Sequence, residues 1–542
     1  TGVTFRTSAL SVGVLALTVV LGHLSLFPQI ADLDAFYHMG HAFAYAEGGI
    51  FNTGLPWATQ SIIADRGADM WWGFHAALMP FTVVGDVQWA IRLAAFTLTA
   101  TLAVCFFWIL NRHAVPGAAW WTLVFMIGVP NVFFRHLMLR PHMMSLAASL
   151  ALLSLLVRGR ARTAFLVSAL ITWLHLSLFW MAPGIVIAYV MVRYLEAVIG
   201  APKARESIAP AAAVSAVFLG TVAGWLLRPH PIEAGALANV QIIRLFAQKA
   251  TQEPLLFAAE LLPIPFMELL QTSWLFFIVW LIACVGVVTY LGKNKLQDVP
   301  PEERTLLLTS LLISVAFALL ATVSARRAMV QWVAFGALGL PIFWTHVAYV
   351  YDRRGMKQFV GVAVALHLAW GGWRHTLNVT QVAFDPDTLE SAAQFVEDNS
   401  EPGEVVFHAR WDNFGPLFAH NRKNLYIGGM DPIFQFVHEP RFYWEYFYIS
   451  ADINVEWTCD AFPCNAGLAT DTHEVLRDHF GARWVIVEPF RNPRFSLYLL
   501  SDERYRLAHD GGNSAVFEIM DAPTAPDIAP LATDTLRAGP GL

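Results

Sequence analysis

The sequence predicts a polytopic α-helical membrane protein that ends in an α/β domain. Hydrophobic residues make up 56% of the 542 residues and charged residues only 14%, whereas soluble domains carry roughly 25% charge. Up to about residue 375 the apolar runs are roughly 17–25 residues long, enough to cross a bilayer core of about 30 Å. From about residue 385 the chain shows mixed charges, turn residues and short strand-like segments. Two different parts are therefore expected.

We expect about eleven membrane spans and three regions. The first region, 1–380, is a transmembrane domain interrupted by two long loops, 28–86 and 227–271. Residues 385–525 alternate strand and helix patterns around turns such as Gly511–Gly512, which predicts a small mixed sheet with covering helices. The tail 526–542, rich in Pro, Ala and Asp, is expected to be flexible. The spans are expected at 8–27, 87–110, 118–134, 142–157, 163–178, 180–197, 207–226, 272–292, 305–323, 329–350 and 357–374.

The distribution of Lys and Arg predicts how these spans are oriented across the membrane. Lys and Arg gather in alternate loops, and the groups begin at Arg112, Arg158, Arg193, Lys293 and Arg353. Such loops face the cytoplasm. An odd number of spans then places both long loops and the C-terminal domain on the periplasmic side of a bacterial inner membrane.

The cysteines agree with that orientation. Cys459 and Cys464 flank a four-residue loop in the C-terminal domain. We expect them to form a disulfide, because an extracytoplasmic domain is exposed to oxidising conditions. Cys105 and Cys284 lie within apolar spans and are expected to be small core residues. No basic patch interleaved with aromatic residues is present, so we expect no nucleic-acid partner.

The first long loop opens with an acidic, histidine-containing segment, DLDAFYHMGH. If a helix begins near Asp34, then Asp34, His38 and His41 share one face. They could bind a divalent cation, or Asp34 could act as a general base with Asp32 as its partner. Alternatively, Asp34 caps an interfacial helix and the histidines fill polar surface.

This loop resembles the first external loop of GT-C glycosyltransferases, and above all the D-x-[YF]-[YF]-H stretch of oligosaccharyltransferase catalytic subunits. The segment HARWDNFG, residues 408–415, is similar to the W-W-D-Y-G motif of those subunits. The resemblance implies an enzyme that moves a sugar or glycan from a polyprenyl-phosphate or polyprenyl-pyrophosphate donor at the periplasmic face. It implies catalytic roles for Asp34 and Asp32 and substrate contacts for Trp411 and Asp412.

The sequence departs from the oligosaccharyltransferase pattern in two places. The next external loop, residues 135–142, has no carboxylate where those enzymes complete a metal site, so a Mg or Mn ion and a metal-independent mechanism both stay open. In the second motif Arg410 replaces the first Trp and Phe414 occupies the Tyr position. The acceptor is therefore left open as a lipid, a glycan or a protein.

Arginines at the outer ends of spans are candidates for a lipid-linked phosphate. Arg binds phosphate oxygens through two parallel hydrogen bonds, although a single outward Arg often only reaches toward lipid headgroups. Two histidines near the same ends join them as substrate-binding candidates. Glu253 and Glu260, in the second long loop, are candidate acceptor contacts. The substrate-binding candidates are Arg135, Arg140, His142, His175, Arg228, Arg326 and Arg327.

Three other functions compete with sugar transfer to a non-protein acceptor. An oligosaccharyltransferase acting on protein would share the same plan. A flippase for lipid-linked sugars is disfavoured because carboxylates are scarce in the spans and no internal repeat is visible. A non-catalytic assembly protein would explain the C-terminal domain but not the acidic and arginine groups. The sugar, the stereochemical outcome and the oligomeric state are not fixed by the sequence.

Overall fold

The computed structural model describes residues 2–199, 209–251, 255–292, 295–346, 370–375, 377, 382–453, 455–465, 467 and 469–520. Most of the expected span 357–374, the tail 526–542 and the loop residues Lys293, Arg353 and Glu253 lie outside these ranges. The chain divides into two compact units. The helical unit comprises 1–31, 92–227 and 258–383, and the mixed unit comprises 32–91, 228–257 and the chain from Phe384 onward.

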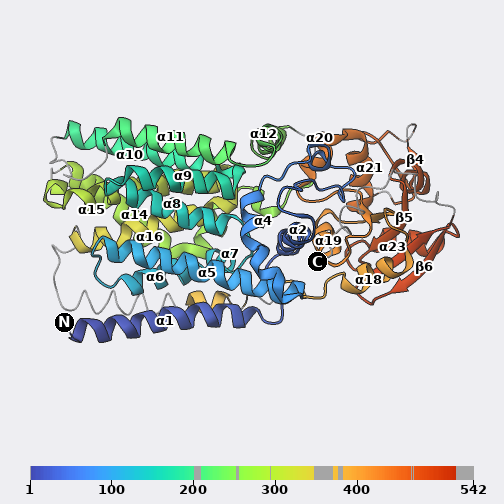
Figure 1. Cartoon of the computed structure of the whole chain (residues 1–542), viewed down its shortest axis with the longest axis horizontal. Coiled ribbons are helices and arrows are strands. Elements are labelled where there is room, and N and C mark those ends of the chain that lie inside the picture. The colour runs from blue at the N-terminus through green and yellow to red at the C-terminus, as the bar shows by residue number, and fades with distance from the viewer. Residues whose placement is uncertain are drawn as a thin grey trace, which may run out of the picture. The chain divides into compact units, whose positions relative to one another are not determined.

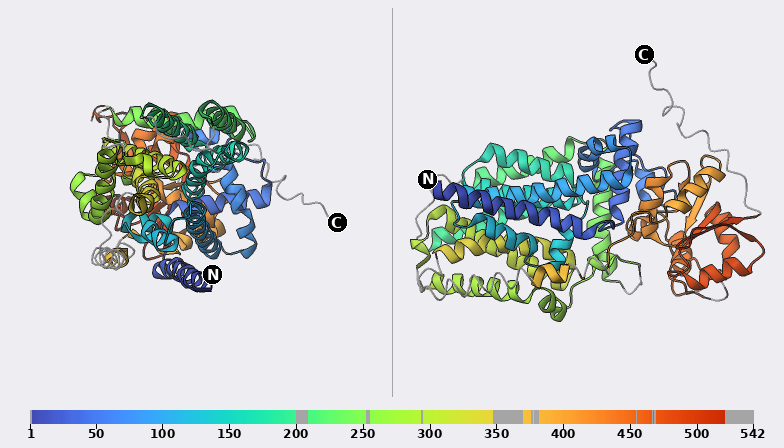
Figure 2. Two further views of the ribbon diagram at one scale, coloured as in Figure 1. Left: turned by 90° about the vertical axis from the view of Figure 1, so that its left-hand side faces the viewer. Right: turned by 90° about the horizontal axis from the view of Figure 1, so that it is seen from below.

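The helical unit consists of long apolar helices that run side by side (Figures 1 and 2). Each predicted span other than 357–374 coincides with a helix or a bent pair of helices, which confirms the polytopic membrane fold. The helices are α1 (Gly2–Leu26), α5 (Val87–Arg112), α6 (Ala118–Ile127), α7 (Pro130–His136), α8 (His142–Val157), α9 (Ala161–Leu174), α10 (Met181–Val198), α11 (Pro210–Leu226), α14 (Phe266–Gly292), α15 (Pro301–Val323) and α16 (Met329–His346).

The helices are less regular than the predicted spans. Within the described ranges, 5 helices are long and apolar enough to cross a membrane, or up to 7 if each bent pair is one span. The predicted span 118–134 bends by 94° between α6 and α7, because Pro130 lacks the N–H needed to continue α6. Helices α8 and α9 are only 16 and 14 residues long.

Small residues allow α11 to approach α9 closely. A Cβ atom at Gly220 would lie 2.3 Å from the carbonyl oxygen of Phe165, and one at Gly224 would lie 2.1 Å from that of Ala169. These glycines are spaced four residues apart, as in the small-xxx-small pattern by which membrane helices associate without a hydrophobic driving force.

The mixed unit contains a five-stranded mixed sheet in the order β2-β1-β5-β7-β6. Strand β1 pairs in parallel with β2 and β5, and β7 pairs antiparallel with β5 and β6. This confirms the predicted mixed sheet and its terminal hairpin. The strands are β1 (Val405–His408), β2 (Leu425–Tyr426), β5 (Ala482–Val487), β6 (Tyr505–Asp510) and β7 (Ala515–Ile519).

Helices pack on this sheet through an apolar core. Phe407, Val485 and Phe517 from the strands are fully or almost fully buried, together with Ile449 and Phe495 from the helices. A small second sheet pairs β3 (Trp457–Thr458) with β4 (Thr470–Asp471). The helices are α18 (Glu390–Asn399), α19 (Phe414–His420), α20 (Pro432–His438), α21 (Pro440–Ser450), α22 (Thr472–Glu474) and α23 (Pro493–Ser501).

The predicted disulfide is present. Cys459 is bonded to Cys464 in the segment between β3 and β4. Cys105 and Cys284 are free and partly buried.

Both long loops fold with the C-terminal domain. The first loop forms α2 (Asp34–Gly48), α3 (Ile62–Arg66) and α4 (Trp72–Leu78), and the second forms α12 (Pro231–Asn239) and α13 (Leu245–Lys249). Between α2 and α3 the chain runs along the outer strand β2. There Tyr426 N–H donates to the carbonyl of Trp57, and Thr59 N–H donates to that of Tyr426. The prediction had grouped both loops with the transmembrane region.

A close contact joins α2 to α19 within this unit. A Cβ atom at Gly415 would lie 2.7 Å from the carbonyl oxygen of Leu33, just before α2. We expect Gly415→Ala to destabilise the mixed unit by about 1–3 kcal/mol, the usual cost of overpacking. The apparent melting temperature of the full-length protein in detergent would fall. Gly54→Ala is the matched control, since its nearest neighbour would be the Pro56 side chain at 3.8 Å. Equal melting temperatures for both variants would contradict the contact.

Candidate functional site

Helix α2 begins at Asp34, as predicted from the sequence. Asp34 lies in its first turn and is partly buried, and Asp32 just before it is 7% exposed. His38 and His41 lie on the buried face, at 2% and 1% exposure. The alternative interpretation is therefore wrong on both points: Leu33 is the N-cap residue, and the histidines do not fill polar surface.

A chain of hydrogen bonds links α2 to the segment before α4. His38 Nδ1 lies 2.8 Å from His75 Nε2, and His75 Nδ1 lies 2.6 Å from Asp69 Oδ2. The same oxygen accepts a hydrogen bond from the Tyr45 hydroxyl at 2.7 Å, while Oδ1 accepts one from Trp71 N–H at 2.7 Å. A buried carboxylate with these donors fixes the orientation of the His75 ring.

His41 completes this group by stacking on His75. The ring centroids are 4.4 Å apart and the planes differ by 24°. Burial, and secondarily the neighbouring His75, lower the pKa of His41 to about 3, so its imidazole is neutral at physiological pH. Burial alone would raise the pKa of Asp69, but His75, His41 and Tyr45 hold it well below its usual range. The group therefore contains an ionised carboxylate.

The structure brings together a different metal-ligand set from the one predicted. Ligand atoms of His41, Asp69 and His75 all lie within 4.8 Å of one another. Of the predicted set, only His41 belongs to this group: His38 contacts it through His75, and Asp34 is not a member. Asp69 and His75 carried no signal in the sequence, because Asp69 precedes α4 and so shares no helical periodicity with His75.

Arg228 supports the Asp69 segment from the second long loop. It is 5% exposed, and its guanidinium donates to the carbonyl oxygens of Met70 at 3.1 Å and Asp69 at 3.4 Å. Burial lowers its pKa to about 10, which leaves it charged. The contacts described for Arg228 are thus with protein backbone, and its predicted role in phosphate binding stays a prediction.

The second motif of the resemblance packs beside the first. The ring of Phe414 lies 6.2 Å from that of Tyr37 on α2. Trp411 packs against the core of the sheet. Asp412 accepts hydrogen bonds from Arg491 at 2.7 Å and from Arg410 at 3.3 Å. Segments about 370 residues apart in the sequence therefore meet in one unit, although the roles of Trp411 and Asp412 toward a substrate stay predictions.

In the helical unit, two candidate arginines share one carboxylate. Glu260 accepts from Arg135 at 2.7 Å and from Arg140 at 2.8 Å. Burial opposes its ionisation, but Arg140, Arg135 and Arg327 together hold the pKa of Glu260 well below its usual range. Three guanidinium groups thus act on one carboxylate, and this arginine–glutamate cluster keeps a net positive charge.

The remaining candidates lie in the same unit. Arg326 pairs with Glu268 at 3.0 Å. His175 Nδ1 lies 3.4 Å from the Ser145 hydroxyl, near the start of α8. His142 is the first residue of α8 and lies close enough to Arg135 and Arg140 to interact electrostatically with both. The structure therefore places His142 at the arginine–glutamate cluster.

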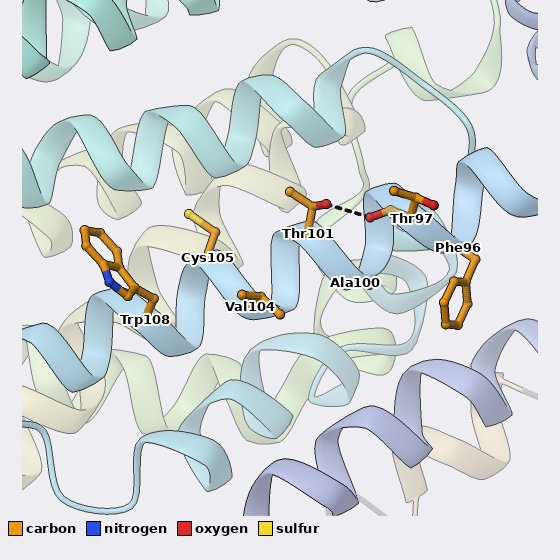
Figure 3. Close-up of a pocket in the computed structure, with 7 residues that line it drawn as sticks. All are labelled: Phe96, Thr97, Ala100, Thr101, Val104, Cys105 and Trp108. Atoms are coloured by element: carbon orange, nitrogen blue, oxygen red, sulfur yellow. Dashed lines mark hydrogen bonds between the residues drawn. The ribbon is translucent and has the colours of Figure 1, made fainter. Parts of the chain in front are cut away.

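A hollow of about 570 Å³ lies along α5 (Figure 3). Its lining runs from Phe96 to Trp108 on that one helix and includes no charged side chain. The Thr101 hydroxyl is turned back to the carbonyl of Thr97. Such a surface suits an apolar lipid chain rather than a reaction.

Comparisons with known proteins support the resemblance at the level of fold. No protein-family model matches the sequence, and no curated protein is similar to it in sequence. The crystal structure of apo ArnT from Cupriavidus metallidurans, a GT-C glycosyltransferase, is similar with 12% identity and a TM-score of 0.51. The match covers 95% of this chain and 98% of ArnT. This chain therefore shares the overall fold of ArnT.

Two further solved structures are similar with lower scores. An Archaeoglobus fulgidus oligosaccharyltransferase, solved with zinc and sulfate, shows 11% identity and a TM-score of 0.49 over 94% of this chain and 74% of its own. ArnT bound to undecaprenyl phosphate shows 12% identity and a TM-score of 0.41 over 94% and 98%.

The arginine–glutamate cluster allows a stability prediction. The Glu260 side chain is 19% exposed and its two arginine partners 16% and 17%. Glu260→Gln removes the carboxylate charge that two largely buried guanidinium groups share, so we expect a loss of about 2–4 kcal/mol.

Glu268→Gln is the matched control. It breaks the more exposed pair with Arg326, whose side chains are 37% and 33% exposed, and should cost less than about 1 kcal/mol. Thermal unfolding of both full-length variants in detergent measures the difference. Equal destabilisation would show that Glu260 is not the counter-ion of the arginines.

Proposed function

We propose that this protein is an integral-membrane glycosyltransferase that moves a sugar or glycan from a polyprenyl-phosphate or -pyrophosphate donor. The acceptor would be a lipid, glycan or protein at the periplasmic face of a bacterial inner membrane. The GT-C fold supports the enzyme class. The observation that carries the proposal is the packing of α2 against residues 414–419, since both motifs that resemble oligosaccharyltransferases meet there.

Asp34 is proposed as the general base. It lies in the first turn of α2, where the helix dipole favours a negative charge and so keeps a carboxylate ready to accept a proton. Asp32 lies two residues earlier as its acidic partner. The acceptor would lose a proton to Asp34 as it attacks the sugar carbon that bears the phosphate, and the phosphate would leave with the bonding electrons. Because phosphate leaves readily, a base and charge stabilisation are the main requirements.

The arginine–glutamate cluster is proposed to bind the donor phosphate. Glu260 engages Arg135 and Arg140 through the same kind of charge-assisted hydrogen bonds that a phosphate oxygen would make. A phosphate that enters would displace Glu260 or share the guanidinium groups with it. The net positive charge of the cluster favours sharing.

The competing functions are supported to different degrees. An oligosaccharyltransferase acting on protein would have the same fold, so only the nature of the acceptor distinguishes transfer to protein from transfer to a lipid or glycan. For a flippase, a mobile acidic group within the membrane would be needed. Glu196 in α10 is held by Arg304 at 3.0 Å and Arg193 at 3.1 Å, so that carboxylate is fixed by ion pairs.

The first test removes the proposed base. Asp34→Asn should lower the rate of sugar release from a radiolabelled polyprenyl-phosphate sugar by about 10²–10⁴-fold, the usual effect of losing a general base. The assay contains purified protein and a membrane extract that supplies lipid, glycan and protein acceptors. Asp65→Asn is the control, since Asp65 is an exposed acid of the same loop paired with His438. Wild-type turnover by a folded Asp34→Asn protein would refute the proposed base.

The second test changes the proposed phosphate site. Replacing both Arg135 and Arg140 by Gln should weaken binding of a polyprenyl phosphate by more than roughly 100-fold, since two charge-assisted hydrogen bonds are lost and each is worth about 1.5–3 kcal/mol. Glu260→Gln removes the competing carboxylate and should tighten binding. Microscale thermophoresis with the detergent-solubilised protein at low temperature would measure both. If the two variants shift the affinity in the same direction, the donor phosphate binds elsewhere.

A further inference from the structure

Three metal-binding side chains are gathered in the interior of the mixed unit. His41 comes from α2, His75 from α4 and Asp69 from the segment before α4. They are 1%, 0% and 3% exposed, and their ligand atoms lie within 4.8 Å of one another. Polar side chains at this depth are normally fully hydrogen-bonded. This group, which we call the His41–Asp69–His75 cluster, is not fully hydrogen-bonded within the described part of the chain.

One atom of the cluster lacks a partner. Within the described part of the chain, His41 Nε2 is buried and makes no hydrogen bond. Leaving such a buried nitrogen unpaired is unfavourable. Its other nitrogen, Nδ1, faces the Tyr37 hydroxyl at 3.4 Å. His41 thus has one ring nitrogen occupied outside the cluster and one left over.

In the other two residues, His75 and Asp69, part of the hydrogen bonding also goes to residues outside the cluster. His75 directs Nδ1 to Asp69 and Nε2 to His38. The Asp69 carboxylate is held by Tyr45 and by the backbone N–H of Trp71. Histidines that bind metal almost always donate their second ring N–H to a neighbour, and ligating carboxylates are themselves hydrogen-bonded. Tyr37, His38, Tyr45 and Trp71 supply these outer contacts.

We propose that the His41–Asp69–His75 cluster binds one zinc ion through His41 Nε2, His75 Nδ1 and an Asp69 carboxylate oxygen. Two imidazoles and one carboxylate form a typical zinc donor set, with water as the fourth ligand. The ion takes the place of the proton between His75 Nδ1 and Asp69, and His75 binds it as a neutral ring. The single proton of that ring moves to Nε2, which donates to His38 Nδ1, and His38 carries its own proton on Nε2.

The movement required is small. Zinc–nitrogen and zinc–oxygen bonds of about 2.0–2.2 Å in a tetrahedral arrangement separate two ligand atoms by about 3.3 Å. His75 Nδ1 and Asp69 Oδ2 are now 2.6 Å apart, so this pair needs to separate by less than about 1 Å. Ligand atoms at the limit of 4.8 Å need to approach by about 1.5 Å. The ion would tie α2, which carries Asp34, to the segment before α4. A hydrogen-bonded relay without an ion explains the His38–His75–Asp69 chain but leaves His41 Nε2 unpaired.

The experiment measures zinc directly and does not depend on sugar transfer. Tag-free full-length protein, purified in detergent without chelator, should contain close to one zinc per chain by mass spectrometry. After removal of the metal with dipicolinate, calorimetric titration with zinc chloride should recover one site. His41→Gln and Asp69→Asn should each weaken zinc binding by more than roughly 100-fold, and Tyr37→Phe, which alters only an outer contact, by about 10-fold.

The control variant is His509→Gln. His509 lies on β6, where its Nε2 is 2.7 Å from the Ser391 hydroxyl and its ring stacks on Phe395. None of these residues belongs to the cluster, so zinc binding should be unchanged. Because the cluster variants are buried and could fail to fold, X-ray absorption of the wild-type protein at the zinc edge gives an independent measurement. Scattering from two imidazoles is expected. A wild-type protein that takes up no zinc, wild-type affinity in folded His41→Gln, or a spectrum without imidazole scattering would each overturn the proposal.

Discussion

The mixed unit depends on the close approach of two backbones. Gly415, at the start of α19, leaves no room for a side chain against the Leu33 carbonyl, and Gly40 in α2 faces the ring of Phe418. This contact lets a loop near the N-terminus and a domain more than 300 residues later share one interior. The position of Asp34, the burial of the histidines and the place of residues 408–415 all follow from it.

Much of the fold could be predicted from the sequence, because it is encoded locally. Apolar runs located the spans, and alternating patterns with Gly and Pro turns located the strands and the terminal hairpin. The bend at Pro130 and the short helix α9 were missed, since a hydropathy run does not record where a helix breaks. The grouping of both long loops with the C-terminal domain was also missed, because it depends on contacts between distant segments.

The candidate site was predicted only in part, for a similar reason. The spacing of Asp34, His38 and His41 correctly gave one helical face. Their partners could not be found this way, because Asp69 and His75 approach from a separate segment. Glu260 is a comparable case. The sequence suggested an acceptor contact, whereas the structure shows it as the counter-ion of Arg135 and Arg140. Ion pairs between distant segments leave no periodic pattern in the sequence, so the sequence alone does not predict them.

The pairing of residues 57–59 with the outer strand β2 has a consequence for how this protein is made. The loop leaves the ribosome long before Tyr426 is synthesised, so its hydrogen-bonding partner does not yet exist. Until then α2 must remain without the apolar surface of α19 that covers it. The C-terminal segment in turn has an open sheet edge whenever the loop is absent, and open edges invite pairing with other chains. The segment that contains α19 and β2, which is synthesised long after the first loop, is therefore also the part that allows that loop to fold.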